Sequence, residues 1–243
     1  DRQWSRGLGD VYKRQTMLWI KTFFGITFQI SFLALLIYLP AWTLNWPDAL
    51  LWIFIFSIIV FSGSTYLLIT KPESIEARLN YNPEVQPQED KLATTLMFSA
   101  IIVGLILSPI DVFHLQLSPV FSGWLKTSGL FIFSFGLFFV MAAMIANEFA
   151  ETTVNIQEDR GQKVIDSGVY SLVRHPMYTG FIFFIIGTNI WLGTYLSLIL
   201  SLCFLSIALK TRINIEEKTL IKDLEGYEDY CKRVKARVIP YLF

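Results

Sequence analysis

The sequence has 243 residues, of which 53% are hydrophobic and only 16% are charged, against roughly 25% charged residues in an average soluble chain. This composition predicts a membrane protein. Lysine plus arginine (20) balances aspartate plus glutamate (20), so no net positive charge attracts nucleic acid and we exclude a nucleic-acid partner. The chain holds only two histidines and two cysteines, so we expect neither a disulfide framework nor a metal site.

The first sixteen residues differ in composition from the rest of the chain, and the first methionine, Met17, directly precedes an apolar run. We set residues 1–16 aside as a non-native or disordered extension. Residues 17–146 hold four apolar runs, each close to the ~20 residues that a bilayer core requires. These four predicted spans are residues 22–39, 49–69, 92–110 and 127–146. The polar segment of residues 70–91 contains three prolines and is predicted to be a surface loop.

Residues 177–209 form a further apolar region, and its 33 residues are too many for one ordinary span. Gly193 and Thr194 interrupt this region near its middle. We therefore predict a helical hairpin of two short spans, each of about 16 residues and roughly 24 Å long. The predicted fold is all-α: a polytopic membrane helical bundle of about six spans, in which the last two form a hairpin, with cytoplasmic C-terminal helices.

The distribution of basic residues supports six spans, because lysine and arginine collect in cytoplasmic loops. With six spans, one side of the membrane receives the N-terminus, residues 70–91, residues 147–176 and the C-terminal tail, which together carry 19 of the 20 basic residues. The other side receives only Lys126. We therefore predict a multi-pass integral membrane protein with both termini in the cytoplasm.

The polar segment that leads into the hairpin has the features of a ligand-binding helix start. Pro176 suits the first turn of a helix, and His175 then occupies the cap position. The N–H groups and positive dipole end of such a helix favour an anion, while the rings of Tyr170 and Tyr178 suit a cation. S-adenosylmethionine presents both, a carboxylate and a sulfonium. The alternative is that Arg174 and His175 only anchor the helix end among lipid headgroups.

A second polar cluster stands where the hairpin returns to the cytoplasmic face. Arg212 and Glu216 are four residues apart and share a helix face. Taken alone they predict a surface ion pair worth a few tenths of a kcal/mol. Because the two arms of the hairpin are nearly equal in length, however, Arg212 returns to about the membrane depth of His175. The two polar clusters are therefore predicted to meet at one membrane surface.

The C-terminal third resembles the isoprenylcysteine carboxyl methyltransferases and their bacterial relatives, which share features with phospholipid methyltransferases. The resemblance covers about residues 150–240 and rests on an ordered set of motifs. In chain order these are Gly168-Val169-Tyr170, Arg174-His175-Pro176, Tyr178, Gly180, Gly187-Thr188, Arg212, Glu216-Glu217, Leu220-Ile221, Tyr227, Tyr230, Lys232-Arg233-Val234 and Pro240. The four predicted N-terminal spans carry no such motif.

The resemblance implies that residues 147–243 form a methyltransferase catalytic region with S-adenosylmethionine as its cofactor. It also implies a role for individual residues. The residues implied to line the cofactor pocket are Gln157, Gln162, Lys163, Val164, Ile165, Tyr170, His175, Pro176, Met177, Tyr178 and Glu216. The same resemblance gives Arg212 the task of holding the methyl acceptor.

The chemistry of methyl transfer determines which further groups are needed. Transfer from a sulfonium is an in-line displacement, and a carboxylate acceptor is already ionised at neutral pH and needs no base. Arg212 would orient that carboxylate by a two-point contact, while alignment and exclusion of water supply most of the acceleration. If the acceptor is a thiol or an amine, a proton must leave, and Glu217 is the nearest candidate base.

We therefore predict an integral membrane S-adenosylmethionine-dependent methyltransferase whose lipophilic small-molecule or lipid-modified acceptor enters from the bilayer. A prenylated protein, a phospholipid amine and a small thiol all remain open as acceptors, as does the oligomeric state. The alternative enzyme is a membrane NADPH-dependent reductase, since some sterol reductases have a related C-terminal region. A non-catalytic or transport protein has little support, because the predicted spans hold almost no ionisable residues.

Overall fold

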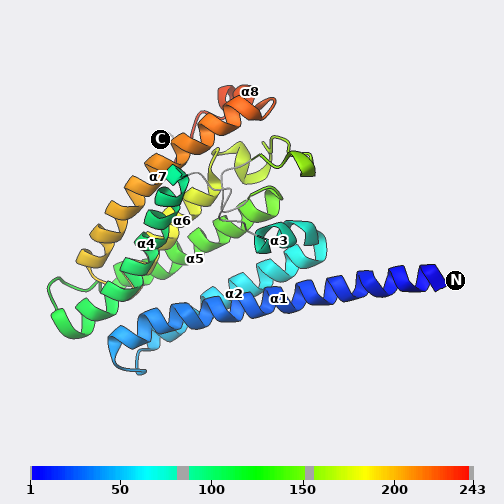
Figure 1. Cartoon of the computed structure of the whole chain (residues 1–243). Coiled ribbons are helices and arrows are strands. Elements are labelled where there is room, and N and C mark those ends of the chain that lie inside the picture. The colour runs from blue at the N-terminus through cyan, green and yellow to red at the C-terminus, as the bar shows by residue number, and fades with distance from the viewer. Residues whose placement is uncertain (1, 81–87, 151–155, 241–243) are drawn as a thin grey trace.

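The structure is a computed structural model that describes residues 2–80, 88–150 and 156–240. Within these ranges the chain is built from helices (Figure 1). The α-helices are α1 (Arg2–Ala41), α2 (Pro47–Thr70), α3 (Pro72–Leu79), α4 (Gln88–Ile110), α5 (Gly123–Ala146), α6 (Pro176–Leu192), α7 (Tyr195–Asp223) and α8 (Tyr227–Arg233). A π-helix, η1 (Asp111–Leu115), continues α4, and two 3-10 helices, η2 (Glu158–Arg160) and η3 (Gly168–Ser171), precede α6. The predicted all-α fold is confirmed.

Five helices in the described part of the chain are long and apolar enough to cross a membrane. These helical stretches are Tyr12–Ala41, Pro47–Thr70, Asp90–Leu115, Gly123–Ala146 and Tyr195–Asp223. The fifth predicted span, which is the first arm of the hairpin, corresponds to α6, an apolar helix of 17 residues and roughly 25 Å. The four predicted N-terminal spans and the hairpin are thus all helical, and the chain is an integral membrane protein.

The turn of the predicted hairpin lies at Gly193 and Thr194. The side chain of Thr194 accepts a hydrogen bond from the N–H of Ser197, and the Ser197 hydroxyl accepts one from the N–H of Thr194, so α7 begins with a reciprocal capping box. A Cβ atom at position 193 would lie 2.3 Å from the Ser197 hydroxyl and 2.4 Å from the Ser108 hydroxyl. Glycine is therefore the residue that fits this turn.

Close packing against α5 fixes the position of α6. A Cβ atom at Gly136 would lie 2.3 Å from the backbone nitrogen of Phe184, and one at Gly187 would lie 2.1 Å from the backbone nitrogen of Phe133. The two helix backbones are therefore in direct contact, as small residues allow in membrane helices. Helix α6 also contacts α7, and α4 packs along α7 (Figure 1).

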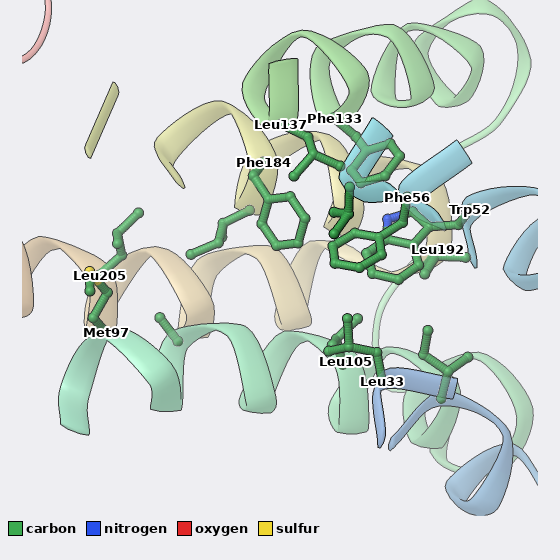
Figure 2. Close-up of a cluster of buried hydrophobic side chains, with 14 of the residues drawn as sticks. Leu33, Trp52, Phe56, Met97, Leu105, Phe133, Leu137, Phe184, Leu192 and Leu205 are labelled. Atoms are coloured by element: carbon green, nitrogen blue, oxygen red, sulfur yellow. The ribbon is translucent and has the colours of Figure 1, made fainter. Parts of the chain in front are cut away.

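An aromatic cluster joins α2 to the α5–α6 pair (Figure 2). Trp52 is fully buried and stacks on Phe56 and Phe133, with ring centroids 5.4 and 5.0 Å apart. Its indole N–H donates to the Thr188 hydroxyl at 3.1 Å. This cluster attaches the hairpin of α1 and α2 to the remaining helices.

The prediction of a surface loop over residues 70–91 is wrong at both ends, because residues 72–79 form helix α3 and residues 88–91 begin helix α4. Pro72 stands at the first helical position, with Glu73 in the first turn and Arg78 in the last, a favourable arrangement for both ends of a helix. Residues 81–87 lie outside the described residues. Helix α1 includes residues 2–16, and Arg14 pairs with Glu76 at 2.9 Å. That residues 1–16 are a non-native extension stays a prediction.

Candidate functional site

A cavity of about 560 Å³ lies inside the bundle and has two chemically different ends. The polar end is lined by Arg78, Asn147, Gln162, Lys163, Tyr170, Arg174, His175, Tyr178, Arg212, Glu216, Tyr227 and Tyr230. The apolar end is lined mainly by Ile26, Phe32, Leu33, Leu36, Phe56, Val60, Met97, Phe98, Ile101, Ile102, Leu137, Val140, Met141, Phe181 and Phe184. A ligand with a polar head and an apolar body matches this arrangement.

The structure brings nearly all of the predicted site residues to this cavity. The residues that line it are Gln162, Lys163, Val164, Ile165, Tyr170, His175, Pro176, Met177, Tyr178, Arg212 and Glu216. Gln157 and Glu217 are not among the lining residues. The predicted meeting of the two polar clusters therefore occurs in space, while the chemical role of each residue stays a prediction.

His175 occupies the cap of α6, and Pro176 stands at the start of the helix, as predicted. The His175 ring stacks on the ring of Tyr178, with centroids 5.5 Å apart. Its Nδ1 lies 3.7 Å from a carboxylate oxygen of Glu216. The N–H groups of Tyr178 and Thr179 already donate to the carbonyl of His175 at 3.1 and 3.2 Å. Two N–H donors of the first turn are thus engaged within the helix itself.

Tyr178 links Arg212 to Glu216. The Nε of Arg212 donates to the Tyr178 hydroxyl at 2.9 Å, and that hydroxyl donates to Glu216 Oε2 at 2.6 Å. Arg212 is only 3% exposed, so the interpretation of Arg212 and Glu216 as a surface ion pair is wrong. Instead, three side chains from both arms of the hairpin form one hydrogen-bonded chain along the cavity wall.

Two residues of α4 complete the surroundings of Arg212. The Nη1 of Arg212 lies 2.9 Å from Asp90 Oδ1 and also donates to the hydroxyl of Thr94. Both residues are buried. Sequence reasoning missed them, and the only signal was an aspartate and a threonine four residues apart at the start of an apolar run.

Glu217 points into a buried ion cluster instead of the cavity. Its Oε1 receives two contacts from Arg174, at 2.6 and 2.7 Å, and one from His175 Nε2 at 3.3 Å. Its Oε2 pairs with Arg237 at 3.0 Å. The structure does not place Glu217 where the sequence prediction of a base requires it, because cations engage both carboxylate oxygens. Arg174 likewise holds a buried carboxylate, and the alternative of a mere headgroup anchor is not supported.

Gln157 holds a loop together outside the cavity. Its side-chain nitrogen donates to the carbonyl of Phe149 at 2.7 Å, and its side-chain oxygen accepts from Arg160. Its N–H donates to Gln162 Oε1 at 2.8 Å. Gln157 therefore supports the neighbouring cavity residue Gln162 and does not itself line the cavity.

A C-terminal strap, residues 234–238, binds across the start of α6. The N–H groups of Arg174 and His175 donate to the carbonyls of Ala236 and Arg237 at 3.0 and 2.8 Å. Arg174 Nη1 also donates to the carbonyl of Val234 at 2.7 Å. The strap thereby fixes the backbone of His175 at the start of α6.

Helix α3 supplies cations to the C-terminal end of α5. Lys71 Nζ donates to the carbonyl of Ile145 at 2.8 Å, and Arg78 Nε donates to the carbonyl of Ala150 at 2.9 Å. These contacts satisfy carbonyls at and beyond the helix end, where the dipole favours a positive charge.

Burial raises the pKa of the nearby Tyr170 above its usual range, so its phenol stays neutral and remains able to donate.

Comparisons with known proteins agree with this architecture. A family model described as phospholipid methyltransferase matches residues 124–225, from α5 through α7. The chain is 30% identical over 115 residues to the protein-S-isoprenylcysteine O-methyltransferase of Schizosaccharomyces pombe, which covers 46% of this chain and 49% of that protein. It is 29% identical over 201 residues to a "Probable protein-S-isoprenylcysteine O-methyltransferase" of Oryza sativa subsp. indica, covering 79% of this chain and 96% of that protein.

A Delta(14)-sterol reductase of Saccharomyces cerevisiae is 29% identical over 138 residues, covering 54% of this chain and 32% of the reductase. The chain thus spans about half of the S. pombe methyltransferase and about a third of the reductase. Among solved structures, the eukaryotic intramembrane Ras methyltransferase ICMT has a TM-score of 0.55 at 22% identity, covering 87% of this chain and 74% of that chain. This last similarity shows a shared fold.

The chain is thus a helical integral membrane protein whose segment from α5 through α7 matches the phospholipid methyltransferase model. In sequence it is similar to the isoprenylcysteine O-methyltransferases, and in fold to the intramembrane methyltransferase ICMT. The resemblance inferred from the sequence is confirmed.

Proposed function

We propose that the chain is an integral membrane methyltransferase that uses S-adenosylmethionine and acts on a lipophilic acceptor. The observation that carries this proposal is the single cavity with a polar end at Tyr170, His175 and Glu216 and an apolar end between α1, α2, α4, α5 and α6. A polar cofactor and an apolar acceptor can meet in such a cavity, with Arg212 on its wall at the polar end.

The polar end has the side chains that S-adenosylmethionine requires. The ring of Tyr178 and the carboxylate of Glu216, held by the Tyr178 hydroxyl at 2.6 Å, suit a cationic sulfonium. Gln162 and Lys163 line the same end and suit the polar groups of the cofactor. When bound, S-adenosylmethionine supplies an electrophilic methyl group. The protein's own residues then hold the acceptor in line and exclude water.

Among the possible acceptors, a lipid-modified carboxylate fits the site best. Arg212 is a buried guanidinium on the cavity wall and suits a charge-assisted hydrogen bond to a carboxylate. A carboxylate needs no base, which agrees with Glu217 being engaged by Arg174 and Arg237. The relatives named for isoprenylcysteine O-methylation support an acceptor of this kind.

Methyl transfer in a membrane extract tests the proposal. Purified protein is incubated with radiolabelled S-adenosylmethionine and host membranes, and the labelled product is treated with base. We expect base-labile label, which indicates an ester. Base-stable label would indicate a nitrogen or sulfur acceptor, and an absence of label would overturn the proposed activity.

Similarity to the sterol reductase makes an NADPH-dependent reductase the second candidate. Thermal shift in detergent separates the two. We expect S-adenosylhomocysteine to raise the melting temperature and NADPH to leave it unchanged. The opposite result would favour the reductase.

We also propose that both termini are cytoplasmic, which the charge distribution supports. Trp124 is 82% exposed at the N-terminal end of α5, and the side chain of Lys222 is 82% exposed near the end of α7. In a variant whose two native cysteines are replaced by serine, Trp124→Cys should react with an impermeant thiol reagent in intact cells. Lys222→Cys should react only after permeabilisation. The reverse pattern would invert the topology.

A further inference from the structure

A buried carboxylate on α4 faces the proposed acceptor-binding arginine. Asp90 has no exposed surface, and its Oδ1 lies 2.9 Å from Arg212 Nη1. Thr94 is one helical turn further along α4 and accepts a hydrogen bond from the same nitrogen. Both residues lie before residue 124, where the family model begins to match.

Burial of this carboxylate is costly unless a cation compensates it, since removing a charge from water carries a large desolvation penalty. Arg212 is that cation, and the side chains of Asp90 and Arg212 are 0% and 4% exposed. Such a pair contributes little net stability compared with apolar residues of the same shape. The main consequence of the pair is therefore the orientation that Asp90 gives to the Arg212 side chain.

The contacts define the orientation of the guanidinium group. Arg212 Nη1 is held from α4 by Asp90 and Thr94, while Nε is held from α6 by Tyr178 at 2.9 Å. Contacts at two nitrogens from two different helices fix both the position and the plane of a rigid, planar group. A planar donor orients an acceptor only if its own plane is fixed.

We infer that Asp90 is a positioning residue for Arg212, and that Thr94 assists it by holding the same nitrogen. This inference rests on the proposed function, because it concerns how Arg212 presents its donors to the acceptor. It assigns part of the site to α4, a helix that carries none of the sequence motifs. Asp90 acts through Arg212 and is not expected to contact the cofactor.

A double-mutant cycle with Asp90→Asn and Arg212→Lys tests this inference. Asp90→Asn keeps the shape of the side chain and removes the charge. We expect it to lower kcat for methyl transfer by about tenfold and to change the affinity for S-adenosylhomocysteine by less than about twofold. If Asp90 acts through Arg212, the double variant should be no slower than Arg212→Lys alone, because the single effects are not additive.

A buried aspartate elsewhere on the same continuous helical segment provides the matched control. Asp111 is also 0% exposed, but it holds the N–H of Leu117 and the hydroxyl of Ser118. Asp111→Asn should lower the melting temperature without lowering kcat per folded molecule. If the effects of Asp90→Asn and Arg212→Lys on kcat instead multiply in the double variant, the positioning role is overturned. The proposed function would stay intact.

Threonine 94 gives a second test if Asp90→Asn does not fold. Thr94→Ser keeps the hydroxyl and should retain kcat, whereas Thr94→Val keeps the shape and should lower kcat several-fold with unchanged cofactor affinity. Equal activity of the two variants would overturn the inference. A wild-type protein that binds no S-adenosylhomocysteine and transfers no methyl group would instead overturn the proposed function, and this inference with it.

Discussion

The N-terminal region (α1 to α4) and the C-terminal region (α5 to α8) are built differently. In the C-terminal region the backbones of α5 and α6 touch, and the strap of residues 234–238 binds the start of α6. In the N-terminal region helix α1 extends away from the bundle at its N-terminal end (Figure 1), and a Cβ atom at Gly25 would have no atom within 4 Å. In the C-terminal region direct backbone contacts fix the positions of the helices. The N-terminal helices pack mainly through side chains.

The sequence motifs of the site are distributed unevenly between the same two regions. Motifs that need exact backbone placement, such as His175 with Pro176, stand in the tightly packed region. The N-terminal region supplies the apolar walls of the cavity, including Leu33 and Phe56, together with Asp90 and Arg78 from its polar segments. Apolar walls tolerate many side chains of similar volume, so this half of the site leaves little trace in a sequence.

The largest expected effect breaks the tight packing of the C-terminal region. In Gly187→Ala the new Cβ atom would lie 2.1 Å from the Phe133 nitrogen and 2.6 Å from the Gly129 carbonyl oxygen. Because both are backbone atoms, relief requires helix movement, and we expect destabilisation of about 3 kcal/mol or more. Size-exclusion chromatography in detergent should show loss of monodisperse protein. Gly25→Ala in α1 is the matched control and should behave as wild type; similar behaviour of the two variants would contradict the proposed contrast.

The next largest effect concerns Arg212. Arg212→Lys keeps the charge but loses the planar, oriented guanidinium, so methyl transfer should fall by about tenfold or more, equivalent to ~1.4 kcal/mol of transition-state stabilisation. The affinity for S-adenosylhomocysteine, measured by thermal shift or calorimetry, should stay unchanged. Lys210→Arg, at an exposed position of α7, is the control. Joint loss of cofactor affinity and turnover would move Arg212 into the cofactor pocket.

The hairpin and most of the polar end could be predicted from the sequence because their signals are local. Gly193 interrupts an apolar run, and Pro176 marks the start of a helix whatever that helix packs against. Asp90 was not predictable, since its partner Arg212 is 122 positions away and an aspartate before an apolar run reads as a headgroup contact. Helix α3 was missed because it is short and polar, and the prolines around it are typical of a loop. Glu217, the predicted candidate base, does not line the cavity as its neighbour Glu216 does, because adjacent helix residues point in different directions.

A smaller effect sharpens the role of the N-terminal walls. Phe56 and Phe184 line the apolar end of the cavity, whereas Trp52 is not among the lining residues. Trp52, one helical turn from Phe56, stacks on the Phe56 ring and packs at a tilt against the Phe184 ring (Figure 2). These three rings form an aromatic layer at the apolar end. We expect Phe56→Leu to deepen the apolar end and to raise kcat/KM for longer-chain acceptors relative to shorter ones.

The expected gain is about fourfold for each additional CH₂ group accommodated, since burial of one such group contributes ~0.8 kcal/mol. A series of acceptor analogues with increasing chain length measures it. Phe54→Leu, at a position 60% exposed on the same helix, should leave the chain-length profile unchanged. An unchanged profile in Phe56→Leu would mean that the acceptor chain does not reach this layer.

The smallest expected effect is that of deleting residues 1–16. Helix α1 would keep residues 17–41, roughly 37 Å of helix and enough to cross a bilayer core. The contact known to be lost is the pair of Arg14 with Glu76, whose side chains are 76% and 35% exposed. Such surface pairs contribute about 0–1 kcal/mol, and none of residues 1–16 lines the cavity among the described side chains. Methyl transfer should therefore stay within about twofold of the full-length chain. Glu76→Ala in the full-length chain removes the same pair and should match the deletion in melting temperature, whereas a deletion that abolishes transfer would show that this segment belongs to the working protein.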